Sequence, residues 1–117
     1  MSQPCPPTER GLYDWEIEQA QRVFAGSLNY ARVRIHECTG WPDSVYHMGI
    51  KLQRRAPNPK VHNAITVGNH CYFPVQLARE LLPPEHGEFY KIGWLMHELT
   101  HAWQYQHMGW KYLFRAL

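Results

Sequence analysis

The sequence predicts an α+β fold, and three stretches of the chain carry this prediction. Apolar residues recur at helical spacing over Asp14–Phe24. Two short apolar stretches flank Gly68 and Asn69, which is the pattern of a β-hairpin, because both residues tolerate a positive φ in a tight turn. A long apolar run with helical character surrounds Leu95–Trp103. Helices and short strands in this order are typical of one small α+β domain.

The first half of the chain is predicted to hold a tail, a helix and a strand. Residues 1–11 are polar and rich in proline, so we expect a flexible tail before a single domain over residues 12–117. Asp14 is a plausible N-cap of the first helix, and Gly26 a plausible stop. The alternation over residues 30–36 places Val33 and Ile35 on one face of a half-buried strand. Residues 37–60, with several glycines and prolines, predict a long irregular connection with a short strand near 49–53.

The second half is predicted to hold the hairpin and three helices. The hairpin spans residues 63–73, and Pro74 ends it. A helix is expected over residues 75–82, before Pro83 and Pro84. The long helix is expected to begin near residues 85–88 and to stop at Gly109, followed by a short helix over residues 110–117.

Composition excludes several classes of protein. The 117 residues are enough for one domain, and the net charge of +2 comes from scattered Lys and Arg, so we expect no nucleic-acid and no membrane partner. No stretch approaches ~18 consecutive apolar residues, and the start lacks a secretory signal. The three cysteines have no CxxC spacing, which favours reduced thiols. A cytoplasmic location is therefore expected, with any export through a signal-peptide-independent secretion system.

The long helix contains an HExxH motif, His97-Glu98-Leu99-Thr100-His101. At ~100° per residue the two histidines lie only ~40° apart and one turn from each other, so both imidazoles can reach one Zn2+ ion. Glu98 then lies beside the metal as a candidate catalytic base, which takes a proton from water and hands it to the leaving amine. The motif therefore predicts zinc-dependent hydrolysis of a peptide or protein substrate.

A catalytic zinc site normally has three protein ligands, and the sequence leaves the third open. No Asp or Glu follows Glu98. His107 has the offset of the third histidine in HExxHxxGxxH, but Gln104 stands in the glycine position. An unbroken helix would place His107 ~80° around from His97 and ~9 Å beyond His101, so a turn would have to break the helix. The alternatives are a solvent or partner group, or residues folded in from upstream, namely His62, His70, His86, Glu80, Glu85 and Glu88.

Some of these residues also have simpler interpretations. The motif fixes only three positions, so the histidines could be unrelated surface residues and Glu98 could bond the backbone of an underlying sheet. The wide apolar surface of the helix argues against this, because buried polar groups need partners. Gln104 and Gln106 could orient substrate or the groups that bind metal.

Two segments, Gly68–Pro74 and Leu95–Gln104, resemble a known family. They are similar to the small zincin-like domains of bacterial contractile injection and type VI secretion systems, the extracellular contractile injection system core-domain family and related spike-associated proteins. Members of that group have a GN-type strand followed by a helix of the form HELxHxxQ. The resemblance covers roughly residues 60–113.

The resemblance implies a minimal zincin-like fold, a short twisted sheet with the HExxH helix packed on it. It also implies that His97 and His101 bind the metal and that Glu98 is the catalytic acid and base of a metallopeptidase. A chain of this kind fits a toxin-like effector or a processing protease for a secreted cargo. The alternative is a non-catalytic accessory or binding module whose partner is a protein of the secretion apparatus or its cargo.

Overall fold

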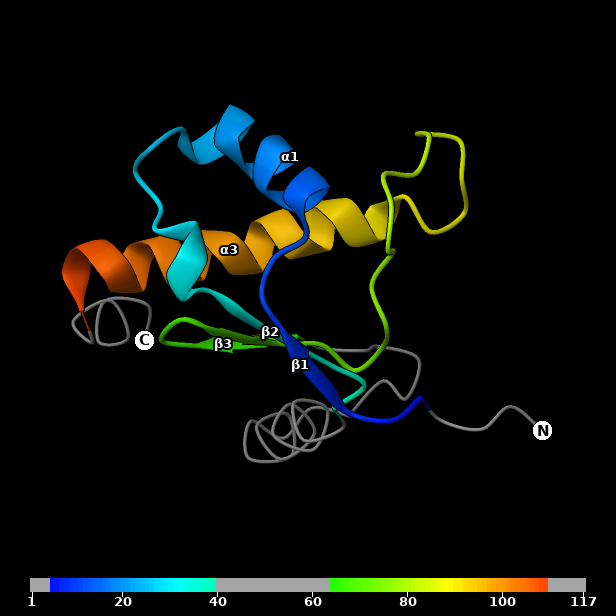
Figure 1. Cartoon of the computed structure of the whole chain (residues 1–117), viewed down its shortest axis with the longest axis horizontal. Helices are drawn as coiled ribbons and strands as arrows, with labels where there is room; N and C mark the ends of the chain where they lie inside the picture. The colour runs from blue at the N-terminus through cyan, green and yellow to red at the C-terminus, as the bar shows by residue number, and fades with distance from the viewer. Residues whose placement is uncertain (1–4, 40–63, 110–117) are drawn as a thin grey trace, which may run out of the picture.

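A four-stranded mixed sheet forms one layer of the protein (Figure 1). The computed structural model describes residues 5–39 and 64–109. Its strands lie in the spatial order β1-β2-β4-β3, with β2 and β4 parallel and the two outer pairs antiparallel. The strands are β1 (Thr8–Arg10), β2 (Arg34–Glu37), β3 (Ile65–Val67) and β4 (His70–Tyr72).

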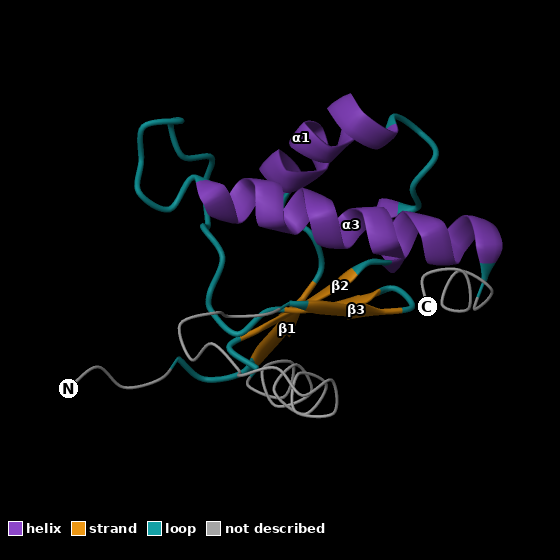
Figure 2. Ribbon diagram, turned by 180° about the vertical axis from the view of Figure 1, so that it is seen from behind, coloured by secondary structure: helices purple, strands orange, loops and turns teal. Residues whose placement is uncertain are grey.

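Two α-helices lie on one side of this sheet. Helix α1 (Asp14–Phe24) is followed by a 3-10 turn, η1 (Tyr30–Arg32), and helix α3 (Tyr90–Met108) is the longest element. Helix α3 contacts β3 and β4 and runs between the sheet and α1 in both views (Figures 1 and 2). Because all three layers bury their apolar faces together, the described part of the chain has a continuous core.

The core is centred between the sheet and α3. Ile35 of β2 and Cys71 of β4 are opposite each other in the parallel register, and both are fully buried. Leu95 and Leu99, one turn apart on α3, pack with them and with Phe73. This packing fixes which side of α3 faces the sheet, and therefore the direction in which the motif residues point.

One network of charges is buried beside this core. Arg10 donates from Nη1 to Glu16 Oε1 at 2.7 Å and from Nε to Glu37 Oε1 at 3.1 Å. Both carboxylates are almost fully buried. Glu37 also accepts the backbone N–H of Leu77 at 2.7 Å, and Glu16 accepts that of Tyr13 at 2.7 Å, at the start of α1. One arginine therefore ties β1 to α1, to β2 and, through Glu37, to the segment after β4.

The structure confirms the α+β class and most of the expected elements. The first helix has the expected bounds, Val33 and Ile35 are both buried, and the hairpin turns at Gly68, whose φ is 62°. Helix α3 starts two residues later than the acidic stretch 85–88 and ends just before Gly109, whose φ is 61°. The expected strand over 30–36 is shorter, because η1 takes up its first half.

The helix expected over residues 75–82 is wrong, because the segment is irregular. Its backbone groups bond to side chains from other elements instead of to each other. Leu77 donates its N–H to Glu37, and the carbonyl of Arg79 accepts from Nε1 of Trp15 at 2.9 Å. Lys91 donates from Nζ to the carbonyl of Gln76 at 3.0 Å. Tertiary contacts thus replace the helical bonds that the local pattern predicts.

The expected tail over residues 1–11 contains strand β1. Thr8 pairs with Glu37 and Arg10 with Ile35, so residues 8–10 are held by β2 rather than free. The short strand expected near 49–53 and the helix expected over 110–117 lie outside the described residues.

The prediction of reduced thiols is wrong for two of the three cysteines. Cys5 and Cys38 form a disulfide with a Cα–Cα distance of 5.7 Å. The antiparallel pairing of β1 with β2 brings them together across 33 residues of sequence, so no local spacing reveals them. Cys71 is free and buried, and burial raises the pKa of its thiol to about 12.

Alkylation should distinguish these three cysteines. We expect iodoacetamide to label none of them in the native protein at pH 8, because the buried Cys71 thiol stays protonated. Denaturation without reductant should expose one thiol, and denaturation with reductant all three, as counted by mass spectrometry. Three labels without reductant would show that Cys5 and Cys38 are not bonded.

In the ranges 5–39 and 64–109, neither helix has the length and apolar character needed to cross a bilayer.

Candidate metal centre

Helix α3 brings His97, Glu98 and His101 together on one side. Each of the three offers a ligand atom, and these atoms lie within 4.8 Å of one another. The imidazole rings of His97 and His101 are 5.0 Å apart between centroids, as expected for residues one turn apart. The His97 side chain is 68% exposed, whereas the Glu98 side chain is 5% exposed. The group therefore opens to solvent above a buried carboxylate.

The Glu98 carboxylate is held between helix and sheet. Oε1 of Glu98 accepts a hydrogen bond from the Thr66 hydroxyl at 2.8 Å, and the same hydroxyl lies 3.2 Å from the Glu98 carbonyl oxygen. Oε2 lies 3.9 Å from Nε2 of His97. Thr66 pairs with Cys71 across the hairpin, so its side chain faces α3 together with the core residues. The hairpin thus fixes one carboxylate oxygen and leaves the other facing His97.

The orientation of His101 is set by Gln104. Nδ1 of His101 lies 3.0 Å from Oε1 of Gln104, three residues later on the same helix. Because an amide oxygen accepts only, this contact favours the tautomer in which Nδ1 carries the proton and Nε2 keeps its lone pair. This is the tautomer that a metal-binding imidazole needs when it binds through Nε2.

If His101 binds zinc, Gln104→Leu should weaken that binding by roughly 10–100-fold, the usual cost of losing the partner that orients a metal-binding histidine. The side chain keeps its size but can no longer accept from His101. Competition with a chromogenic chelator would measure the change.

Gln106→Leu is the matched control on the same helix. Gln106 bonds to the backbone of Asn29 and to the side chain of Asn69, not to the motif. Its replacement should lower the melting temperature and leave zinc affinity unchanged. Equal affinities for wild type and Gln104→Leu would contradict the assigned role of Gln104.

His107 does not join the motif residues. Helix α3 is unbroken from Tyr90 to Met108, so no turn redirects His107 towards His101. Its Nε2 lies 2.6 Å from the carbonyl oxygen of Ser27, and its ring packs on Trp103. The structure therefore places this sequence-predicted ligand in the contact between α3 and the loop after α1.

The upstream residues that were candidates for the third metal ligand also lie away from the motif, where the structure describes them. His70 lies on the opposite face of the sheet beside His36, and His86 accepts from the backbone N–H of Glu88. Glu88 itself pairs with Lys91 at 3.0 Å. Within residues 5–39 and 64–109, no further His, Cys, Asp or Glu joins His97, Glu98 and His101, and His62 is outside these ranges.

A surface hollow of about 720 Å³ lies at the C-terminal end of α3, away from the motif. Asn29, Asn69, Gln106 and His107 are among its lining residues, and none of the lining residues belongs to the HExxH group. The motif residues instead lie near strand β3, at the edge of the described sheet, where Thr66 bonds to Glu98.

Comparison with known proteins gives one informative match. The sequence is 31% identical over 106 residues to the type VI secretion system spike protein VgrG2b of Pseudomonas aeruginosa. The chain resembles part of a secretion spike protein. The aligned residues make up 89% of this chain but only 9% of VgrG2b, so the chain corresponds to a small piece of that relative. No family model and no solved structure matches the chain. The expected link to bacterial secretion is thereby supported.

Sequence reasoning missed Thr66 as a partner of Glu98. The alternating pattern of the hairpin signals that Thr66 shares a face with core residues, but only the packing of α3 shows that Glu98 lies above it. Gln104 was more accessible to prediction, because its spacing from His101 places the two side chains on one helix face.

Proposed function

We propose that the chain is a zinc-dependent hydrolase of peptide bonds, with His97 and His101 as metal ligands and Glu98 as the catalytic base. The observation that carries this proposal is the convergence of two imidazoles and a buried carboxylate within 4.8 Å on α3. Imidazole nitrogens suit zinc, and Gln104 favours the tautomer of His101 that can bind it. These two imidazoles fit zinc, and within residues 5–39 and 64–109 no third protein ligand lies beside them and Glu98.

A zinc ion at such a site lowers the pKa of a water molecule and polarises a substrate carbonyl group. The protein's own contribution is proton transfer. Glu98 takes a proton from the attacking water and later returns it to the leaving amine. Thr66 holds one oxygen of the carboxylate at 2.8 Å, so the other oxygen remains directed towards His97, where the reaction would take place. The exposure of His97 allows an extended substrate to approach.

Metal analysis tests the ligand assignment. After dialysis against zinc-free buffer, we expect His97→Ala and His101→Ala each to retain one zinc ion fewer per chain than the wild type. His107→Ala is the control on the same helix and should retain as much as the wild type, because its ring is engaged with Ser27. Unchanged zinc content in His97→Ala and His101→Ala would overturn the assignment.

The similarity to VgrG2b favours a second proposal, that the chain acts with a type VI secretion apparatus as a spike-associated module or cargo. This role does not require hydrolysis. In a bacterium with such an apparatus, export of the chain should stop when the apparatus is inactivated and should continue for Glu98→Gln. Export that is independent of the apparatus would contradict this second proposal.

A further inference from the structure

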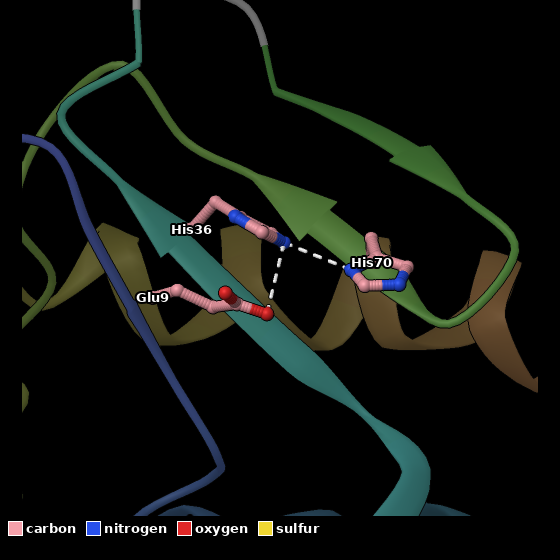
Figure 3. A group of neighbouring side chains, drawn as sticks. All are labelled: Glu9, His36 and His70. Atoms are coloured by element: carbon pink, nitrogen blue, oxygen red, sulfur yellow. Dashed lines mark hydrogen bonds and ion pairs between the residues drawn. The ribbon is translucent and has the colours of Figure 1, made fainter.

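A second group of metal-binding side chains lies on the other face of the sheet, away from α3 (Figure 3). Nε2 of His36 is 2.9 Å from Nδ1 of His70 and 3.9 Å from Oε1 of Glu9. The ligand atoms of all three residues lie within 4.8 Å of one another. Neither the proposed hydrolysis nor the core packing uses them.

The sheet register brings these residues together from three strands. Glu9 of β1 is directly opposite His36 of β2, and His70 of β4 is opposite Arg34, two residues before His36. Ile35 and Cys71 point into the core, so their neighbours on β2 and β4 point to the opposite face. The three residues thus lie on adjacent strands rather than on a loop.

The distance between the two imidazole nitrogens suits a shared metal ion. Two nitrogens that each lie ~2.0–2.1 Å from one ion are separated by roughly 2.9 Å when the bond angle is about 90°. The observed separation is 2.9 Å. Without an ion, one proton must lie between the two nitrogens, and a metal ion can take the place of that proton.

The His36 ring is held in place by a stacking contact. It stacks on Tyr72 with centroids 4.2 Å apart, which fixes the ring plane.

One group opposes a cation at this position. Arg34 donates from Nε to Oε1 of Glu9 at 3.3 Å, and its charge repels a metal ion. Its side chain is 41% exposed, so it can turn into solvent and release the carboxylate. Removing this charge should therefore strengthen metal binding, whereas removing a ligand should weaken it.

We propose that Glu9, His36 and His70 form a second metal site, separate from the HExxH group, for a divalent transition-metal ion. Two imidazoles and one carboxylate favour such ions over Mg2+ and Ca2+, which prefer oxygen ligands. An angle near 90° and the general affinity order both favour Cu2+ over Zn2+. This inference does not depend on the proposed hydrolase activity.

Calorimetric titration of the His97→Ala/His101→Ala protein with Cu2+ and with Zn2+ tests the second site in isolation. We expect one Cu2+ per chain, bound more tightly than Zn2+. His36→Ala or His70→Ala in the same background should weaken Cu2+ binding by at least about 100-fold, since even an outer partner of a metal ligand is worth ~10–100-fold. Arg34→Gln in the same background should strengthen Cu2+ binding.

Three further measurements keep the result interpretable. Glu9→Gln retains the size of the side chain and should weaken binding without loss of fold, as checked by circular dichroism. His86→Ala removes an exposed histidine outside the cluster and should leave the affinity for Cu2+ unchanged. The electron paramagnetic resonance spectrum of the Cu2+ complex should show coupling to two imidazole nitrogens. Affinity that is unchanged by replacement of His36 and His70 would overturn the proposal.

Discussion

Glu98→Gln is expected to abolish peptide hydrolysis while zinc remains bound. The glutamine keeps the size of the side chain and can still meet the Thr66 hydroxyl, but it cannot take a proton from water. General base catalysis contributes roughly 10²–10⁴-fold, so kcat/KM should fall by about that factor. The metal ligands His97 and His101 are unchanged, so zinc content should equal that of the wild type.

The matched control is Glu88→Gln, just before the start of the same helix. Glu88 is 55% exposed, pairs with the buried Lys91 at 3.0 Å and does not reach the motif. Its variant should hydrolyse peptides at the wild-type rate. Wild-type hydrolysis by Glu98→Gln would show that another group acts as the base. Loss of zinc from Glu98→Gln would instead show that the carboxylate is a metal ligand.

Arg10→Met is expected to cause the largest loss of stability. It leaves Glu16 and Glu37 buried without the cation that joins them at 2.7 and 3.1 Å. Breaking a buried ion pair by removing one partner costs about 3–5 kcal/mol, because an uncompensated charge remains in the interior. The free energy of unfolding from urea denaturation should fall by about this amount, a large part of the stability of a small domain.

Arg22→Met is the control for this change. Arg22 lies in the last turn of α1 and is exposed, so its replacement should change the free energy of unfolding by no more than about 0.5 kcal/mol. If Arg10→Met lowered the free energy of unfolding by no more than Arg22→Met does, the buried network would not contribute to stability as described.

The elements predicted well from the sequence are those with local signals. Helix α1 and the core face of α3 follow from apolar periodicity, and the hairpin follows from Gly68 and Asn69. Strand β1 has only three residues, and its stability comes from pairing with β2 far along the chain. The missed disulfide depends on that same pairing.

The residues of the candidate site also fall into those with a local sequence signal and those without one. His97, Glu98 and His101 could be predicted because one helical turn brings them together. Thr66 reaches Glu98 only through the packing of the hairpin on α3. The cluster on the opposite face has no local sequence signal, because its members come from three strands and Glu9 and His70 lie 61 positions apart along the chain.

Cleavage of a proteome-derived peptide library by the zinc-loaded protein tests the central claim most directly. The library removes the need to know the substrate, and mass spectrometry identifies each new peptide end. We expect cleavage by the zinc-loaded protein, none after zinc is removed with a chelator, and recovery when zinc is restored. Absence of cleavage by the zinc-loaded protein, or cleavage that persists after zinc is removed, would contradict a zinc-dependent peptidase built on His97, Glu98 and His101.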